Sequence, residues 1–258
     1  MKAESLFMTA LSQSVVADRS RSITGHNGFL DRYFYFGMSL VIAAITVYGF
    51  SLTIDANLLH AAKPRPLLLW FHGAAFSAWI VFYIVQSALI RTHHVRLHRS
   101  LGWFGAVLGA VMVPLGVAIA VIMGRFHIHQ LHEAASGYEA PLISPLYDMA
   151  AFGILLGLAV YWRRRPDLHR RLMLMATCGL TTAAIARFPI VAIQNDYNYV
   201  CVDSLILLGV ARDVIVDHRV HKAYLYTLPV LVVIQSLMMY VDLSASAWWV
   251  RIAHAILG

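Results

Sequence analysis

Charged residues are scarce in this chain of 258 residues. Asp, Glu, Lys and Arg together make up 13% of it, whereas 60% of the residues are hydrophobic. A soluble domain of ordinary composition carries about 25% charged residues. The shortage excludes an ordinary soluble domain and indicates a protein whose solvent is lipid.

Cysteine is also rare, because the chain has only two, Cys178 and Cys201. Counting 1.5 Å per residue along the expected helices places Cys178 about 13 Å from one membrane face and Cys201 near the other. That separation is too large for a disulfide, whose Cα atoms lie within about 7 Å of each other. A disulfide framework is excluded, and the lack of repeats, low-complexity tracts and long linkers favours a single bundle.

The common catalytic and nucleotide-binding motifs are missing as well. The sequence has no GxSxG, no GxxxxGK[ST], no GxGxxG and no HExxH. These absences remove support for nucleophile-elbow hydrolysis, nucleotide binding and HExxH metallopeptidase chemistry. No basic patch is interleaved with aromatic residues away from the predicted membrane borders, so nucleic acid is not an expected partner. The motifs leave open whether the chain is an enzyme.

Long apolar stretches are what the sequence has in abundance. A membrane-spanning helix needs roughly 20 mostly apolar residues. Seven stretches qualify: Tyr33–Ile54, Pro66–Ile90, Leu101–Met123, Pro145–Trp162, Arg171–Ile193, Tyr199–Val216 and Ala223–Tyr240. The pattern predicts an all-α integral membrane protein, a seven-helix bundle over residues 33–240. Residues 1–32, which lack the apolar core of a cleavable signal, are predicted to be a polar cytoplasmic segment, and residues 241–258 are predicted to be a short outer interfacial segment.

The distribution of Lys and Arg predicts the orientation. The N-terminal segment and the second, fourth and sixth connections carry four, three, five and three of these residues, against four in total on the opposite side. Cytoplasmic loops retain the excess of positive charge. The N-terminus is therefore expected in the cytoplasm and the C-terminus outside a bacterial inner membrane, with anionic lipid headgroups as partners of the basic cluster at 163–171.

Four ionisable residues are expected at one depth near the outer face, namely His72, Asp148, Arg187 and Asp203. Ionisable residues within a membrane span normally face the bundle interior, find a partner there and mark a functional site. We expect Arg187 to pair with Asp148 or Asp203. The group predicts an outward-facing pocket that binds or transports a small polar molecule or anion, or that relays protons.

A polar and aromatic stripe extends this predicted pocket along the second span. His72, Trp79 and Gln86 are spaced by seven residues, which keeps them on one face of a helix. The same side chains would also serve as hydrogen-bonding partners between packed helices, which is a common role of His and Gln in membranes. Both interpretations remain open.

A second group of His and Asp residues lies at the predicted cytoplasmic ends of the helices. His94 with His98, and Asp217 with His221, are four residues apart, the spacing that places two metal ligands on one helical face. His98 and His169 each open a helix at the same depth, as a pair of axial haem ligands would. The cofactor would be haem b or a transition metal, although such positions also suit solvated side chains.

The predicted outer loop after Gly124 is rich in histidine. His127, His129 and His132, followed by Glu133, have a donor chemistry that suits zinc or copper. A polar loop that merely contains several histidines is the alternative.

Three runs carry a resemblance: LHRSLGW at 97–103, RRRPDLHRRLMLMAT at 163–177 and AIARFP at 184–189. With its His-Arg-x-x-Gly and Arg-Arg-Pro-x-x-His-Arg-Arg-Leu-Met motifs, the region from about 66 to 222 resembles a group of bacterial multi-pass inner-membrane proteins of unknown function. The positions that match its motifs are His72, His98, Arg99, Gly102, His169, Arg171 and Arg187. The resemblance implies an analogy with small bundles linked to respiratory oxidase maturation, and thus a respiratory-complex partner.

Three functions follow from these observations. The first is the outer pocket for a ligand or for protons. The second is a haem- or metal-binding redox or oxidase-assembly protein that uses the cytoplasmic-side histidines. The third is a membrane-embedded hydrolase in which His72, Asp148 and Asp203 hold zinc, against which the nearby cation of Arg187 argues. A small-residue face formed by Gly102, Gly105 and Gly109 would seal either a neighbouring helix or a second copy of the chain.

Overall fold

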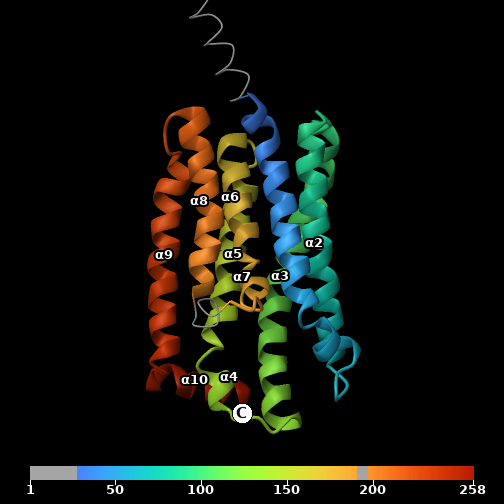
Figure 1. Cartoon of the computed structure of the whole chain (residues 1–258), viewed down its shortest axis with the longest axis vertical. Coiled ribbons are helices and arrows are strands. Elements are labelled where there is room, and N and C mark those ends of the chain that lie inside the picture. The colour runs from blue at the N-terminus through green and yellow to red at the C-terminus, as the bar shows by residue number, and fades with distance from the viewer. Residues whose placement is uncertain (1–27, 191–196) are drawn as a thin grey trace, which may run out of the picture.

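The computed structural model describes residues 28–190 and 197–258. Within these two ranges every regular element is helical and no β-strand occurs. The long helices stand side by side and form one bundle (Figure 1). The all-α prediction is confirmed.

The principal helices run along the bundle axis. They are the first helix (Gly28–Ser51), α2 (Leu67–Arg91), α3 (Val95–Arg125), α5 (Ile143–Tyr161), α6 (Pro166–Gly179), α8 (Asn198–Asp217) and α9 (Lys222–Leu243). Shorter segments connect or extend them: η1 (Asp55–Leu59), η2 (Phe126–Gln130), α4 (Ser136–Glu139), α7 (Thr182–Ile185) and α10 (Ala247–Leu257).

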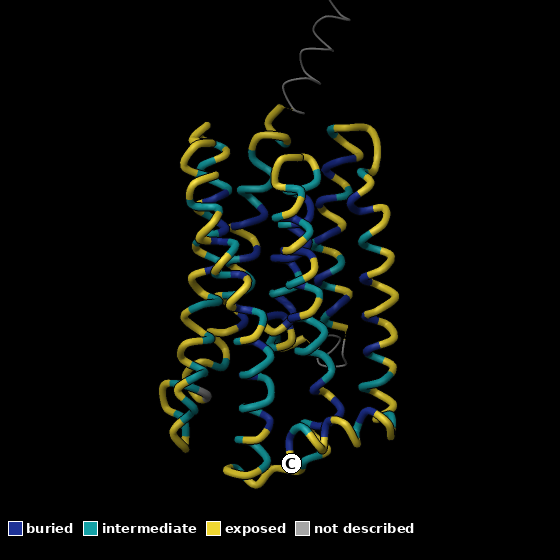
Figure 2. The backbone as a smooth tube through the Cα atoms, turned by 180° about the vertical axis from the view of Figure 1, so that it is seen from behind, coloured by how far each residue is buried: buried dark blue, intermediate teal, exposed yellow. Residues whose placement is uncertain are grey.

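The surface of the bundle is apolar along its length. Val81, Ile154 and Leu237 are 60%, 64% and 61% exposed, and exposed positions recur on every long helix (Figure 2). Soluble monomers rarely expose contiguous apolar patches above a few hundred Å². Five of the described helices are long and apolar enough to cross a membrane: Gly28–Ser51, Leu67–Arg91, Val95–Gln130, Ser136–Tyr161 and Lys222–Leu243. The chain is a multi-pass membrane protein by these criteria.

The predicted fifth span is not one continuous helix, and that expectation was wrong. α6 has 14 residues, which reach about 21 Å against the roughly 30 Å of a bilayer core. The hydroxyl of Thr181 donates to the carbonyl of Cys178 at 2.6 Å, and that of Thr182 to Gly179 at 2.7 Å. Such side-chain bonds compete with helical ones, and the chain turns here before α7. Residues 191–193 of the predicted span lie outside the described residues.

The small-residue face of α3 packs inside the bundle. A Cβ atom on Gly105 would lie 2.1 Å from the Phe82 ring of α2, and one on Gly109 would lie 2.3 Å from Leu156 of α5. Gly102, in contrast, has nothing within 4 Å of its Cβ position. Gly105 and Gly109 therefore let α3 approach its own neighbours, so this part of the face is used within one chain.

The C-terminal segment is helical and anchored. α9 continues to Leu243, and α10 lies across the end of the bundle beside α4 (Figure 1). The Trp249 indole is 7% exposed and donates to the carbonyl of Ala140 at 3.0 Å. Trp248 is 52% exposed. One tryptophan thus fixes α10 to the bundle, while the other remains on the surface, as an interfacial residue would.

Candidate functional site

The predicted outer group divides into two separate sites. The guanidinium of Arg187 donates to Thr53 Oγ1 at 3.1 Å, hydrogen-bonds the carbonyl of Ala183 and lies 4.4 Å from the Phe50 ring centroid. Among the described residues, no carboxylate forms an ion pair with it. The predicted pairing of Arg187 with Asp148 or Asp203 was wrong, because equal depth does not place two residues on facing sides of the bundle.

His72 belongs to the Arg187 side. Its ring lies 4.1 Å from the Phe76 ring, its Nδ1 is buried, and the charge of Arg187 acts on it. Asp148 and Asp203 lie in the other site. The zinc triad of His72, Asp148 and Asp203 is therefore not assembled, and the described residues contain no group of three metal-binding side chains.

A close backbone approach positions Arg187. Gly49 of the first helix packs against the backbone of Ala184 in α7, such that a Cβ atom would lie 2.2 Å from the carbonyl oxygen. A backbone atom cannot move aside as a side chain does. The contact holds α7, and with it Arg187, against Thr53 at the end of the first helix.

We expect Gly49→Ala to destabilise the protein by about 1–3 kcal/mol, the usual cost of overpacking. Gly37→Ala on the same helix is the matched control, because nothing lies within 4 Å of its Cβ position, and alanine there gains helix propensity. Thermal unfolding in detergent measures both variants. Equal unfolding temperatures would contradict the close approach.

The second site is a pair of carboxyl groups inside the bundle, which we call the carboxyl site: Asp148 of α5 and Asp203 of α8. The hydroxyl of Tyr199, one turn before Asp203, donates to Asp148 at 3.0 Å. Gln235 of α9 is 6% exposed and interacts with Asp203. Oδ1 of Asp203 is buried without a hydrogen-bond partner in the described residues. Three helices thus bring two acidic side chains and two neutral hydrogen-bonding groups together.

A small cavity adjoins the carboxyl site. Its free volume is ≈ 20 Å³, room for about one water molecule. It is lined by Tyr147, Asp148, Ala151, Phe152, Leu155, Met175, Ala176, Gly179, Thr182, Tyr199, Val202, Ile206, Leu231 and Gln235. No Lys, Arg or His stands among these lining residues, so the only ionisable carboxyl group in the lining, that of Asp148, faces no cation there.

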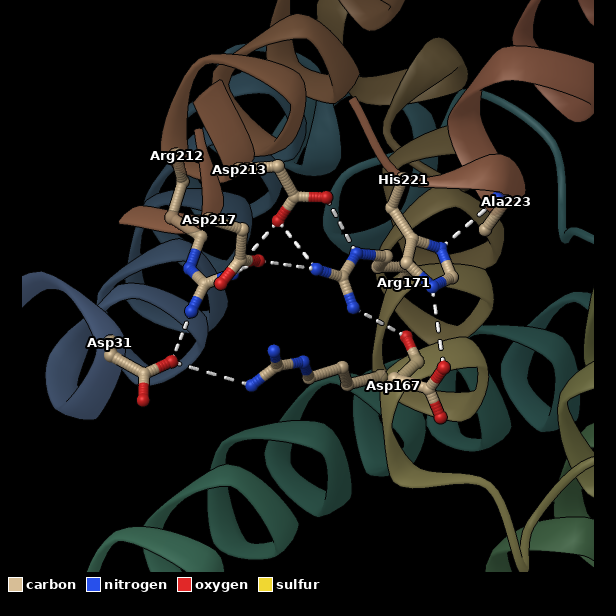
Figure 3. Close-up of polar contacts among 9 residues, drawn as sticks. Asp31, Asp167, Arg171, Arg212, Asp213, Asp217, His221 and Ala223 are labelled. Atoms are coloured by element: carbon tan, nitrogen blue, oxygen red, sulfur yellow. Dashed lines mark hydrogen bonds and ion pairs between the residues drawn. The ribbon is translucent and has the colours of Figure 1, made fainter. Parts of the chain in front are cut away.

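The end of the bundle where the first helix and α6 begin and α8 ends holds a buried ionic cluster that the sequence had not indicated (Figure 3). The guanidinium of Arg171 in α6 donates two hydrogen bonds to the carboxylate of Asp213 in α8, at 2.6 and 2.7 Å. Arg212 donates to Asp213 at 2.8 Å and to Asp217 at 2.7 Å, and it also pairs with Asp31 of the first helix. The side chains of Arg171, Arg212 and Asp213 are at most 2% exposed.

The ionic cluster and its neighbours explain why Asp217 and His221 do not form the predicted metal site. Asp217 is paired with Arg171 at 2.9 Å and is not available to chelate a metal with His221. His221 caps α9 by accepting from the Ala223 N–H at 3.1 Å, and its other nitrogen lies 3.3 Å from Asp167 (Figure 3). The predicted Asp217 and His221 chelate was wrong for this reason.

His98 and His169, in contrast, are brought together. Their ring centroids are 6.3 Å apart, and the rings are nearly perpendicular, at 79°. His94 is turned away, with Nδ1 at 2.9 Å from the hydroxyl of Thr92, so it does not join His98. Gln86 lies near this pair and is 7% exposed, whereas Trp79 is 1% exposed and packs edge-on against Phe152. The stripe on α2 therefore does not line one pocket: Trp79 lies in the core, and the backbone of Gln86 lies beside His98.

The histidines after Gly124 do not converge on one point, because His127 and His129 contact different partners. His127 lies 3.2 Å from Glu133 and stacks on Tyr138, and His129 Nε2 lies 3.1 Å from the carbonyl oxygen of Leu257. His132 adopts a positive φ of 57°. Hydrogen bonds from Tyr138 and His127 hold the pKa of the Glu133 carboxyl below its usual range. The segment is a local hydrogen-bonded turn, and no cluster of metal ligands forms in its described residues.

No protein-family model matches the chain, and no curated protein or solved structure is significantly similar to it. The resemblance to a bacterial inner-membrane group remains a prediction from the motifs.

Proposed function

We propose that this chain is a bacterial inner-membrane protein that binds a proton or a small monovalent cation at the carboxyl site, either to relay or to transport it. The proposed topology has seven membrane-crossing segments, with the N-terminus in the cytoplasm and the C-terminus outside. α8 and α6, which α7 follows in the chain, stand within the bundle beside the five apolar helices (Figure 1), which supports counting α8 and the α6–α7 segment as crossing segments. Their charges fall mainly at the end where Arg and Lys are concentrated.

The observation that supports this proposal most strongly is the negative charge of the carboxyl site. Asp148 lines the cavity, Asp203 interacts with the lining residue Gln235, and no cationic side chain lines the described part of the cavity. Arg187, the expected partner of an anion, is held at Thr53 instead. Ionisable residues within a membrane are rare and mark ion or proton pathways. The acidic surroundings favour a cation over the anion expected from the sequence.

The size of the cavity limits which ligands the carboxyl site can hold. Pockets for drug-sized molecules have volumes of roughly 300–1,000 Å³, whereas the space at the carboxyl site is ≈ 20 Å³. A proton carried by one water molecule, or a small cation that has lost most of its hydration shell, fits this room. Tyr147, Tyr199 and Gln235 supply neutral oxygen atoms around it.

The test is the dependence of thermal unfolding on pH and on Li⁺, Na⁺ or K⁺ at constant ionic strength. We expect acidification or one of these cations to stabilise the wild-type protein, by about 2.7 kcal/mol at 100 times its Kd. Asp148→Asn and Asp203→Asn remove the charge and should abolish the response. Asp55→Asn is the matched control, because the Asp55 side chain is 71% exposed. An unchanged response in both carboxyl-site variants would refute the proposal.

A further inference from the structure

The histidine pair, His98 and His169, lies apart in the fold from the two acids of the carboxyl site, which are on α5 and α8. His98 is in the first turn of α3 and His169 in the first turn of α6. The chain segments that carry them are 71 positions apart, and the fold places the two rings 6.3 Å from each other. The pair therefore goes beyond the proposed function and requires its own explanation.

Each imidazole has one nitrogen free to bind a ligand. The Nδ1 of His169 lies 2.9 Å from the backbone carbonyl oxygen of Ala159, so Nδ1 carries the hydrogen and Nε2 carries the lone pair. A backbone carbonyl that fixes the ring in this way is the usual support of a metal-binding histidine. On His98, Nδ1 is buried and has no hydrogen-bond partner within the described part of the chain.

Gln86 adds a second observation. Its side chain is 7% exposed, and neither its amide nitrogen nor its amide oxygen has a partner among the described residues. The backbone of Gln86 lies beside the His98 ring. Buried polar atoms are nearly always hydrogen-bonded, so the unpaired imidazole nitrogen of His98, and the unpaired amide on the neighbouring residue Gln86, indicate a site for a bound group.

The ring separation indicates what kind of group this is. Two imidazoles that bind one metal ion from opposite sides at about 2.0 Å have ring centroids about 6 Å apart, close to the observed 6.3 Å. Perpendicular ring planes do not disturb this arrangement, because each ring can turn about its metal bond.

The number of protein ligands limits which metal centres fit the pair. No third His, Cys, Asp or Glu completes a cluster with the pair in the described residues. Structural zinc takes four protein ligands, so it is not matched by two imidazoles. Haem iron receives four nitrogens from its porphyrin and needs only axial ligands from the protein. Imidazole is also a suitable ligand for copper, and a cuprous ion can be held by two imidazole ligands.

We propose that His98 and His169 together bind one metal centre that requires two protein ligands, either haem iron or a cuprous ion. The backbone of Gln86 lies beside His98, at one edge of the proposed site. Both forms share the same chemistry, a transition metal between two imidazole nitrogens, and they differ in the source of the remaining ligands.

The experiment uses the full chain, purified in detergent after expression with added haem precursor or with added copper. We expect either a Soret band that shifts on reduction, or one copper per chain by elemental analysis. His98→Ala and His169→Ala should each reduce the bound metal at least tenfold. His94→Ala, an exposed histidine of the same connection, should keep it, as should Asp148→Asn, which separates this proposal from the carboxyl site.

Folding is monitored independently, so that a loss of metal is distinguished from a loss of packing. Helical circular dichroism of each variant must match the wild type, and His169→Met, which offers a different axial ligand, should retain haem with an altered spectrum or retain copper. Wild-type protein that takes up neither haem nor copper would overturn the proposal. So would full metal content in His98→Ala and His169→Ala.

Discussion

Replacing Asp213 by alanine should destabilise the bundle by about 3–5 kcal/mol. The carboxylate is fully buried and accepts hydrogen bonds from Arg171 and Arg212, which are themselves buried. Without Asp213, the buried guanidiniums keep only the partly exposed carboxylates of Asp217 and Asp31 as partners, and breaking a buried ion pair costs more than the loss of the bond itself. Unfolding by denaturant in detergent micelles measures the change.

Asp31→Ala is the control for Asp213→Ala, because it removes a carboxylate from the same cluster. The Asp31 side chain is 52% exposed, and exposed ion pairs contribute about 0–1 kcal/mol. We expect a clear difference between the two variants. If both lower the free energy of unfolding equally, the buried pair does not hold α6 to α8.

Trp79→Ala should have an effect of similar size, about 3–5 kcal/mol, by leaving a cavity where α2, α3 and α5 meet. The Trp79 side chain is 1% exposed, lies 5.2 Å from the Phe152 ring and comes within 3.0 Å of the Cβ position of Gly109.

Trp70→Ala on the same helix serves as the reference, since Trp70 is 47% exposed and faces away from the core. Thermal unfolding in the same detergent compares the two. A Trp70 variant as unstable as the Trp79 variant would show that tryptophan on α2 acts through lipid or detergent contacts and not through packing.

Hydropathy predicted the positions of long apolar helices such as α2 and α9 well. The second apolar stretch, Pro66–Ile90, differs by one residue at each end from α2, and the seventh, Ala223–Tyr240, lies within α9. Apolar length is a property of the sequence alone. The break after Gly179 was not visible in this way, because the apolar stretch continues through the threonines whose hydroxyls end the helix.

The polar interior was less predictable, because depth gives no information on which way a residue faces. His98 and His169 were paired by depth, and the structure places them near each other. Arg187 was paired by the same reasoning with two carboxylates that it does not contact. Arg171 was counted among the loop charges, yet it is buried. Its partner Asp213 lies 42 residues away, and a single sequence does not show such a pairing.

The early end of α6 has an electrostatic consequence for the carboxyl site. A helix carries about half a negative charge at its C-terminus, where the last carbonyl groups lack helical donors. α6 ends at Gly179, which lines the cavity beside Asp148. The dipole of α6 therefore adds a fixed negative potential to that of the two acids, and it does so without a further ionisable side chain. Neutralising Asp148 and Asp203 would leave this potential in place, at a depth where lipid provides no screening.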